Sequence, residues 1–144
     1  MGRMGNTFGS QSVGVGHARK VWREVKDQFP AGGVVANLSD WLESGKGKIP
    51  AGTFCKWYDD AANNGGKKVV CYTKAQITGT ADAAALAALG INGATLYDID
   101  IEAGDTVASA TVVYAGEIYS YMVDADVLAK VKDLAALSEI KFVS

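Results

Sequence analysis

The sequence predicts a mainly β protein: a small antiparallel β-sandwich or barrel-like domain with two short helices, preceded by an extended N-terminal arm that contains one amphipathic helix. Three observations lead to this expectation. Residues 95–102 alternate apolar and polar side chains, the period of a half-buried strand. Residues 111–114 are β-branched or aromatic and uncharged, which is typical of a strand buried on both faces. No helical period appears between residues 95 and 123.

The stretch 95–123 is expected to form a β-meander at the centre of the fold. Gly104 and Asp105 form its turn, and Gly116 marks a bulge or bend in the second strand. The first strand is expected to place Asp98, Asp100 and Glu102 in solvent and Tyr97, Ile99 and Ile101 in the core.

The first 47 residues are predicted to be an arm. Residues 1–16 are rich in Gly, Ser, Asn and Gln, so they bury too little apolar surface to fold alone. Residues 18–29 have a helical period, and a single helical turn capped by Ser39 is expected at 39–43. The glycines of Gly45-Lys-Gly-Lys48 suggest a hinge, which divides the arm, 1–47, from a β-rich body, 48–144.

The body is predicted to begin with a strand at 49–58, followed by a turn at 59–66 and a partner strand at 67–73. A short helix is expected at 82–89, closed by Gly90. A second helix starts at Asp124 or Asp126 and runs through Leu137, and residues 140–143 form a last strand tied into the sheet.

The chain has 144 residues and a net charge of −2, which argues against nucleic acid as its main partner. The charge is uneven: residues 1–58 carry eight Lys/Arg against four Asp/Glu, and residues 59–144 carry six against twelve. A basic arm on an acidic body favours an acidic partner surface. No apolar run approaches 18 residues and no signal-peptide core begins the chain, so we expect no membrane span and folding in a cytoplasm.

No residue pattern points to catalysis or to a cofactor. His17 is the only histidine, which excludes a histidine-based triad within one chain. Cys55 and Cys71 are expected to be small buried hydrophobes, with a disulfide between adjacent strands as the alternative and a metal site disfavoured. The acidic strand is interpreted as a solvated face, with cation binding or glycosidase-like chemistry as alternatives.

The large aromatics of the arm need a covering surface, because the arm has no core of its own. That surface is either the β-domain itself or another protein. The residues predicted to bind a partner surface are Phe8, Val13, Val15, Arg19, Lys20, Val21, Trp22, Arg23, Val25, Lys26, Phe29 and Trp41.

Three segments resemble tailed-bacteriophage head decoration and head-fibre proteins. They are Ile49-Pro-Ala-Gly-Thr53, the run from Gly90 to Ile101 with its Tyr-Asp-Ile-Asp-Ile ending, and Ala110-Thr-Val-Val-Tyr-Ala-Gly116. In that family the pattern is I/L-P-A-G-T, then G-I-x-L-x-D-V-D-V, then A-x-V-x-x-x-G, followed by a helix and often a closing strand. The resemblance covers about residues 45–144 and departs at residues 92–94, which lengthen the middle segment.

The resemblance implies a non-enzymatic virion protein on the exterior of an icosahedral capsid, made in the host cytoplasm and often trimeric. Its partner is then the major capsid protein, held by the N-terminal arm. Three alternatives remain: a head fibre or adhesin that stacks host glycan on Trp57 and Tyr58, a tail or baseplate component, and a small hydrolase built on the strand carboxylates.

Overall fold

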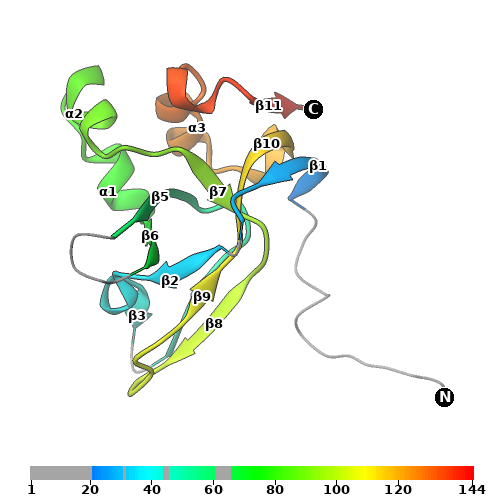
Figure 1. Cartoon of the computed structure of the whole chain (residues 1–144). Helices are drawn as coiled ribbons and strands as arrows, with labels where there is room; N and C mark the ends of the chain where they lie inside the picture. The colour runs from blue at the N-terminus through cyan, green and yellow to red at the C-terminus, as the bar shows by residue number, and fades with distance from the viewer. Residues whose placement is uncertain (1–20, 31, 44–45, 61–65) are drawn as a thin grey trace, which may run out of the picture.

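The computed structural model describes residues 21–30, 32–43, 46–60 and 66–144. Within them the protein is mainly β, as predicted. The larger sheet is curled and comprises β1 (Trp22–Gln28), β2 (Gly33–Val35), β5 (Phe54–Asp59), β6 (Lys67–Cys71), β7 (Gly93–Thr95), β9 (Ser109–Ala110), β10 (Val112–Tyr119) and β11 (Ile140–Val143) (Figure 1). The smaller sheet comprises β3 (Leu42–Glu43), β4 (Lys46–Ile49) and β8 (Ile99–Glu102).

The larger sheet has the order β1-β10-β7-β5-β6-β2-β9, and β11 pairs with β10. Its pairs are antiparallel except β2–β6 and β10–β11. The helices α1 (Lys74–Thr78), α2 (Ala83–Ala88) and α3 (Ala125–Val131) gather at one end of the molecule, and β8 and β9 extend toward the other end (Figure 1). The 3-10 turns are η2 (Leu38–Trp41), η4 (Ser120–Met122) and η5 (Ala135–Leu137).

Two apolar clusters are formed from successive residues of the same strands. The first contains Phe54 and Val113 together with buried residues of all three helices, among them Ile77. The second contains Cys55 and Val112 together with residues of the smaller sheet and η2. Because successive side chains of a strand point to opposite faces, β5 and β10 supply both clusters and are buried on both sides.

Several predicted elements of the body are confirmed. β5 and β6 form the expected hairpin, although the first strand begins at Phe54 and not at residue 49, because residues 50–53 reverse the chain. α2 begins at the N-cap Asp82, and β11 is the expected last strand on the sheet. The second predicted helix starts after Asp124 but is shorter than expected, since α3 ends at Val131 and η5 follows it. The helix α1 was not predicted, although Thr73 and Gln76 form a capping box at its start.

The helix predicted for residues 18–29 is wrong where the structure describes it. Residues 22–28 form β1, which pairs antiparallel with β10. Trp22 is buried and Val25 is 38% exposed, so the apolar face of the expected helix does not exist. Pairing with the uncovered edge of β10 outweighs the weak helical period of this short segment.

The predicted meander is also wrong, because its strands do not pair with one another in sequence. β8 pairs with β4 in the smaller sheet, β9 pairs with β2, and β10 pairs with β7, β1 and β11. Tyr97, expected in the core, is 59% exposed, whereas Ile101 is buried as expected. A bulge or bend is predicted at Gly116. The register irregularity lies in the partner strand β1, between Val25, which pairs with Gly116, and Asp27.

The hinge predicted at 45–48 is wrong for the residues that the structure describes, because residues 46–49 form β4. A Cβ added at Gly47 would lie 1.9 Å from the carbonyl oxygen of Trp41, so this glycine permits a close backbone approach. Ser39 is not an N-cap, because η2 begins after Asn37. Residues 21–43, on the N-terminal side of the predicted boundary at 47, contribute β1, β2 and β3 to the two sheets.

Replacing Trp22 with alanine tests whether β1 belongs to the folded body. We expect Trp22→Ala to lower the free energy of unfolding by about 3–5 kcal/mol, because it empties a core site and removes the indole hydrogen bond to Thr95. Chemical denaturation measures the change. The matched control is Lys26→Ala on the exposed face of the same strand, with an expected change within about 0.5 kcal/mol. Equal, negligible effects would contradict the assignment of β1 to the core.

Candidate functional site

The chain reversal between β4 and β5 is built around one buried threonine. We call residues 50–53 with Thr95 and Asp98 the β4–β5 junction. The Thr95 hydroxyl donates to the Pro50 carbonyl (3.1 Å) and accepts from the Thr53 N–H (3.1 Å). The Thr95 N–H donates to the Thr53 carbonyl (2.9 Å), and its own carbonyl accepts from the Gly52 N–H (2.8 Å). Thr95 is fully buried with every polar group bonded, so it fixes the reversal.

Asp98 completes the junction and is not the solvated carboxylate that was expected. One oxygen accepts from the Ala51 N–H (2.7 Å), the other lies 3.1 Å from Lys48 Nζ, and the side chain is only 9% exposed. Asp100 and Glu102 are exposed, as predicted. Among the described residues no group of three or more His, Cys, Asp or Glu side chains is placed to hold a metal ion.

The junction also holds the first described residues of the chain. The Trp22 indole N–H donates to the Thr95 carbonyl (2.9 Å). Val21 packs on Gly52 so closely that a Cβ there would lie 2.6 Å from Val21 Cγ1. Val21 and Trp22 are 3% and 6% exposed, so in this structure neither presents a surface to a partner, in contrast to their predicted role.

The other predicted partner-binding residues fall into three groups. Phe8, Val13, Val15, Arg19 and Lys20 lie outside the described residues. Arg23, Val25 and Lys26 are exposed on β1, where Arg23 is paired with Glu117 of β10. Phe29 and Trp41 are half-buried against the second apolar cluster, so their covering surface is the protein's own β-domain.

Trp57, one of the two aromatics considered for glycan stacking, is engaged within the fold. Phe29 lies parallel to Trp57, with ring centroids 4.4 Å apart. The Trp57 indole N–H donates to the Gly32 carbonyl (2.8 Å), and Lys67 Nζ lies 5.5 Å from the centroid of the same ring. Phe29 therefore covers one face of Trp57, which leaves less of this ring for a sugar than the sequence suggested.

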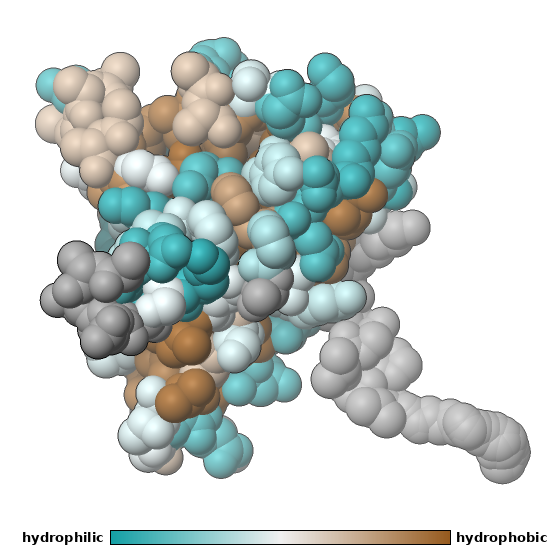
Figure 2. Space-filling model, viewed as in Figure 1, coloured by the Kyte–Doolittle hydropathy of each residue, from teal (hydrophilic) through white to brown (hydrophobic). Residues whose placement is uncertain are grey.

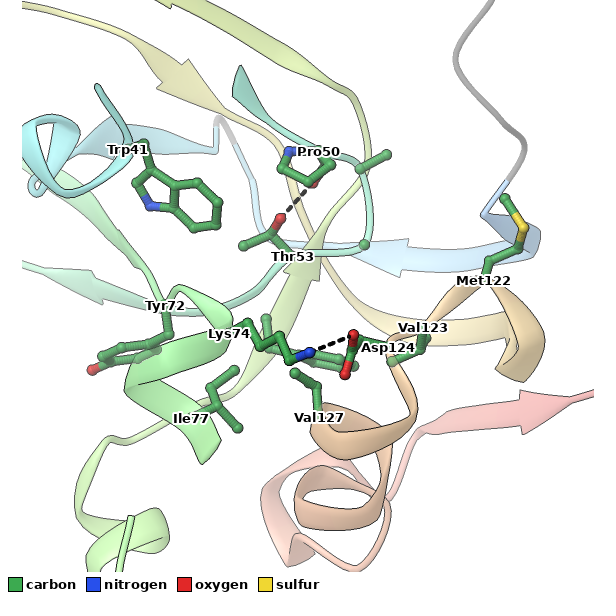
Figure 3. A pocket seen from close by; sticks show the side chains of 13 residues that line it. Trp41, Pro50, Thr53, Tyr72, Lys74, Ile77, Met122, Val123, Asp124 and Val127 are labelled. Carbon is green, nitrogen blue, oxygen red and sulfur yellow. Dashed lines mark hydrogen bonds and ion pairs between the residues drawn. The ribbon is translucent and has the colours of Figure 1, made fainter. Parts of the chain in front are cut away.

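A pocket of about 180 Å³ opens beside the junction, between α1, α3 and the start of β5 (Figure 3). Its apolar wall includes Trp41, Phe54, Tyr72, Met122 and Val127. Its charged groups are Lys74 and Asp124, which face one another 3.0 Å apart (Figure 3). Such a lining can hold a small apolar group beside a charge pair.

The charge pair of the pocket is in a stable ionised state. The hydrogen bond between the two side chains, with the attraction of their charges, raises the pKa of Lys74 and lowers the pKa of Asp124. At neutral pH the amine is therefore protonated and the carboxyl ionised. Neither group is prepared as a nucleophile or as a general acid there.

Sequence reasoning missed this pocket and its charge pair. Asp124 was identified only as a helix start, and its carboxylate does accept from the Asp126 N–H at the start of α3. The Thr73–Gln76 capping box could have indicated α1 and thus the position of Lys74. Nothing local indicates that α1 and α3 pack together.

Comparison with protein-family models, with curated proteins and with solved structures found no match for this chain. The described helices are all too short to cross a membrane. On the face seen in Figure 2, apolar residues lie interspersed with polar ones.

Replacing Asp98 tests its structural role against a catalytic one. We expect Asp98→Ala to lower the free energy of unfolding by about 1–3 kcal/mol, because the Ala51 N–H and Lys48 lose their acceptor. Asp100→Ala, at an exposed position of β8, should change it by less than about 0.5 kcal/mol. Thermal and urea denaturation of both variants provide the measurement. An unchanged free energy of unfolding for Asp98→Ala would show that Asp98 does not stabilise the junction.

The Lys74–Asp124 pair predicts a pH-dependent stability. A carboxyl whose pKa is lowered by folding stabilises the protein above its unfolded pKa, about 3.9, and this contribution is lost as the pH falls through the lowered folded value. Asp124→Asn keeps a capping oxygen but removes the charge, so its melting temperature should lie slightly below wild type at pH 7 and converge with it in acid. Asp124→Ala, which also lacks the cap, should stay lower at both pH values.

Proposed function

We propose that this protein is a structural virion protein that binds the outer surface of a tailed-phage capsid, as a decoration protein or head fibre, with the major capsid protein as its partner. The proposal starts from the resemblance of residues 45–144. The observation that carries it is the convergence at the β4–β5 junction of all three segments on which the resemblance depends.

Each segment contributes to that convergence. Residues 50–53 bond to Thr95 and Asp98 of the middle segment. Thr95 is also the register partner of Val112 in the third segment. Three short sequence matches that form one hydrogen-bonded unit support a shared fold more strongly than three unconnected ones.

The first 20 residues are proposed as the capsid-binding segment. They contain Arg3, Arg19 and Lys20 but no Asp or Glu, and they include the apolar residues Phe8, Val13 and Val15. Such a composition suits an acidic surface with small apolar depressions. This segment enters the body at Val21 and Trp22, which the junction holds in the core. A pulling force on the segment is thus transmitted to the hydrogen-bonded β4–β5 junction.

Arg23 and Lys26 of β1 are included in this proposed contact surface. They are exposed beside Glu24 and Asp27, and Arg23 is paired with Glu117, so the strand adds contacts but no net positive charge. Within the described residues β1 is an end strand of the larger sheet and pairs with β10 alone. We favour a homotrimer, because three copies of one weak contact segment bind a symmetric shell with much greater avidity than one.

Co-sedimentation with capsids tests this function. The full chain should pellet with purified capsids that lack it, at a saturating copy number set by the shell's symmetry. A variant without residues 1–20 should lose most of this binding while keeping the melting temperature of the full chain, because it retains the core residues Val21 and Trp22 and their contacts with the junction.

A charge variant separates electrostatic from apolar binding. Arg19→Glu with Lys20→Glu should weaken capsid binding by at least roughly tenfold at low salt, with a smaller difference at high salt. Undiminished pelleting of the shortened variant would overturn the anchoring role of the segment. Failure of the full chain to pellet with any capsid fraction would overturn the proposed function.

A further inference from the structure

Two cysteines that are far apart in the hairpin sequence face each other across its strands. Cys55 of β5 is the register partner of Cys71 of β6. Both are free thiols, both are 0% exposed, and both belong to the second apolar cluster. Their side chains therefore project to the same face of the sheet.

The backbone hydrogen bonds identify the kind of pair these residues form. The Cys71 N–H donates to Asn37 Oδ1 (3.0 Å), and its carbonyl accepts from Asn37 Nδ2 (2.6 Å) and from Trp41 Nε1 (3.0 Å). The Cys55 carbonyl accepts from the Asn92 N–H (3.0 Å), and Asn92 directly precedes β7, the strand on the other side of β5. These backbone groups thus bond away from the β5–β6 interface.

The bond between the two strands is made one position further along, where the Tyr72 N–H donates to the Phe54 carbonyl (3.1 Å). Cys55 and Cys71 are therefore a non-hydrogen-bonded antiparallel pair. In such pairs the Cα atoms lie about 4.5 Å apart. This separation is within the range of about 4.4–6.8 Å that a disulfide spans.

The two thiols are enclosed together in the core, on register-paired residues. Burial, followed by the neighbouring Cys71, raises the pKa of the Cys55 thiol well above its usual value. In the closed fold Cys55 is therefore a protonated, shielded thiol. Reaction with an oxidant requires the strand ends to separate, during folding or in a transient opening.

We propose that Cys55 and Cys71 are a latent cross-strand disulfide, closed when the chain meets a small-molecule disulfide oxidant. One cysteine thiolate attacks the oxidant, forms a mixed disulfide and releases one small thiol. The second cysteine then attacks the protein sulfur of the mixed disulfide and releases the other small thiol. Two protein thiols are thereby oxidised to one disulfide, and the oxidant is reduced to two thiols.

Formation of the disulfide would link β5 to β6 covalently. Through Cys71 it would also restrain the backbone that bonds to Asn37 and Trp41. Once the strands close, the burial that slows oxidation also protects the bond from reductants. The protein would thus gain stability on passing from a reducing to an oxidising compartment. This inference rests on the β5–β6 register and does not depend on the proposed function.

Oxidative refolding tests the proposal on the full chain. The protein is refolded in a mixture of reduced and oxidised glutathione, unfolded again in acid, and treated with an alkylating reagent in denaturant. We expect intact-mass measurement to find no alkylated thiol and a mass reduced by two hydrogen atoms on a monomeric chain. Two alkylated thiols, or disulfides only between chains, would overturn the proposal.

Stability provides the second measurement. The oxidised protein should melt roughly 5–10 °C above the same protein reduced by a phosphine in denaturant and refolded with the reductant present. Cys71→Ala should show no such reductant-dependent shift and should keep one alkylatable or glutathione-capped thiol. If this variant fails to fold, the wild-type comparison with and without reductant still decides the question, since equal melting temperatures would contradict a stabilising staple.

Discussion

The buried side chain of Thr95 is the contact on which most of the described structure depends. It bonds to Pro50 and Thr53 in the reversal between β4 and β5, and its carbonyl holds the Trp22 indole. A buried hydroxyl or peptide group left unpaired costs about 1–3 kcal/mol. Breaking any one of these hydrogen bonds therefore destabilises the fold. The first strand, the smaller sheet and the centre of the larger sheet are therefore positioned through one residue.

The position of Thr95 explains why residues near the start of the chain are part of the body. Trp22 is covered on the sheet side by the core and bonded at its nitrogen to the junction. The rest of β1 runs along β10 and carries four exposed charged side chains, Arg23, Glu24, Lys26 and Asp27. Charged side chains on an end strand oppose uncontrolled pairing with other sheets. In the proposed function this same strand joins the contact segment to a rigid body.

The larger sheet is covered on both faces where β5 and β10 carry the uncharged, buried residues Phe54, Cys55, Val112 and Val113. Phe54 faces the helices, and its neighbour Cys55 faces the smaller sheet and η2. Asn37 and Trp41 bond to the backbone of Cys71 on the side away from β5, where β2 pairs with β6 only at Lys68 and Val69 among the described residues. Side chains thus complete the hydrogen bonding of β6 at a buried position, as an interior sheet requires.

The sequence by itself determined the mainly β class, the β5–β6 hairpin, the short helix α2 before Gly90 and the strand positions of both cysteines. These features follow from turn chemistry, capping residues and two-residue periodicity, which act between near neighbours. Only the tertiary structure decided that residues 22–28 pair with β10, that the central strands belong to different sheets and that Asp98 is nearly buried. A local pattern specifies which side of a strand is apolar, but its pairing partner is chosen by contacts between distant segments, and these contacts outweigh a weak local preference.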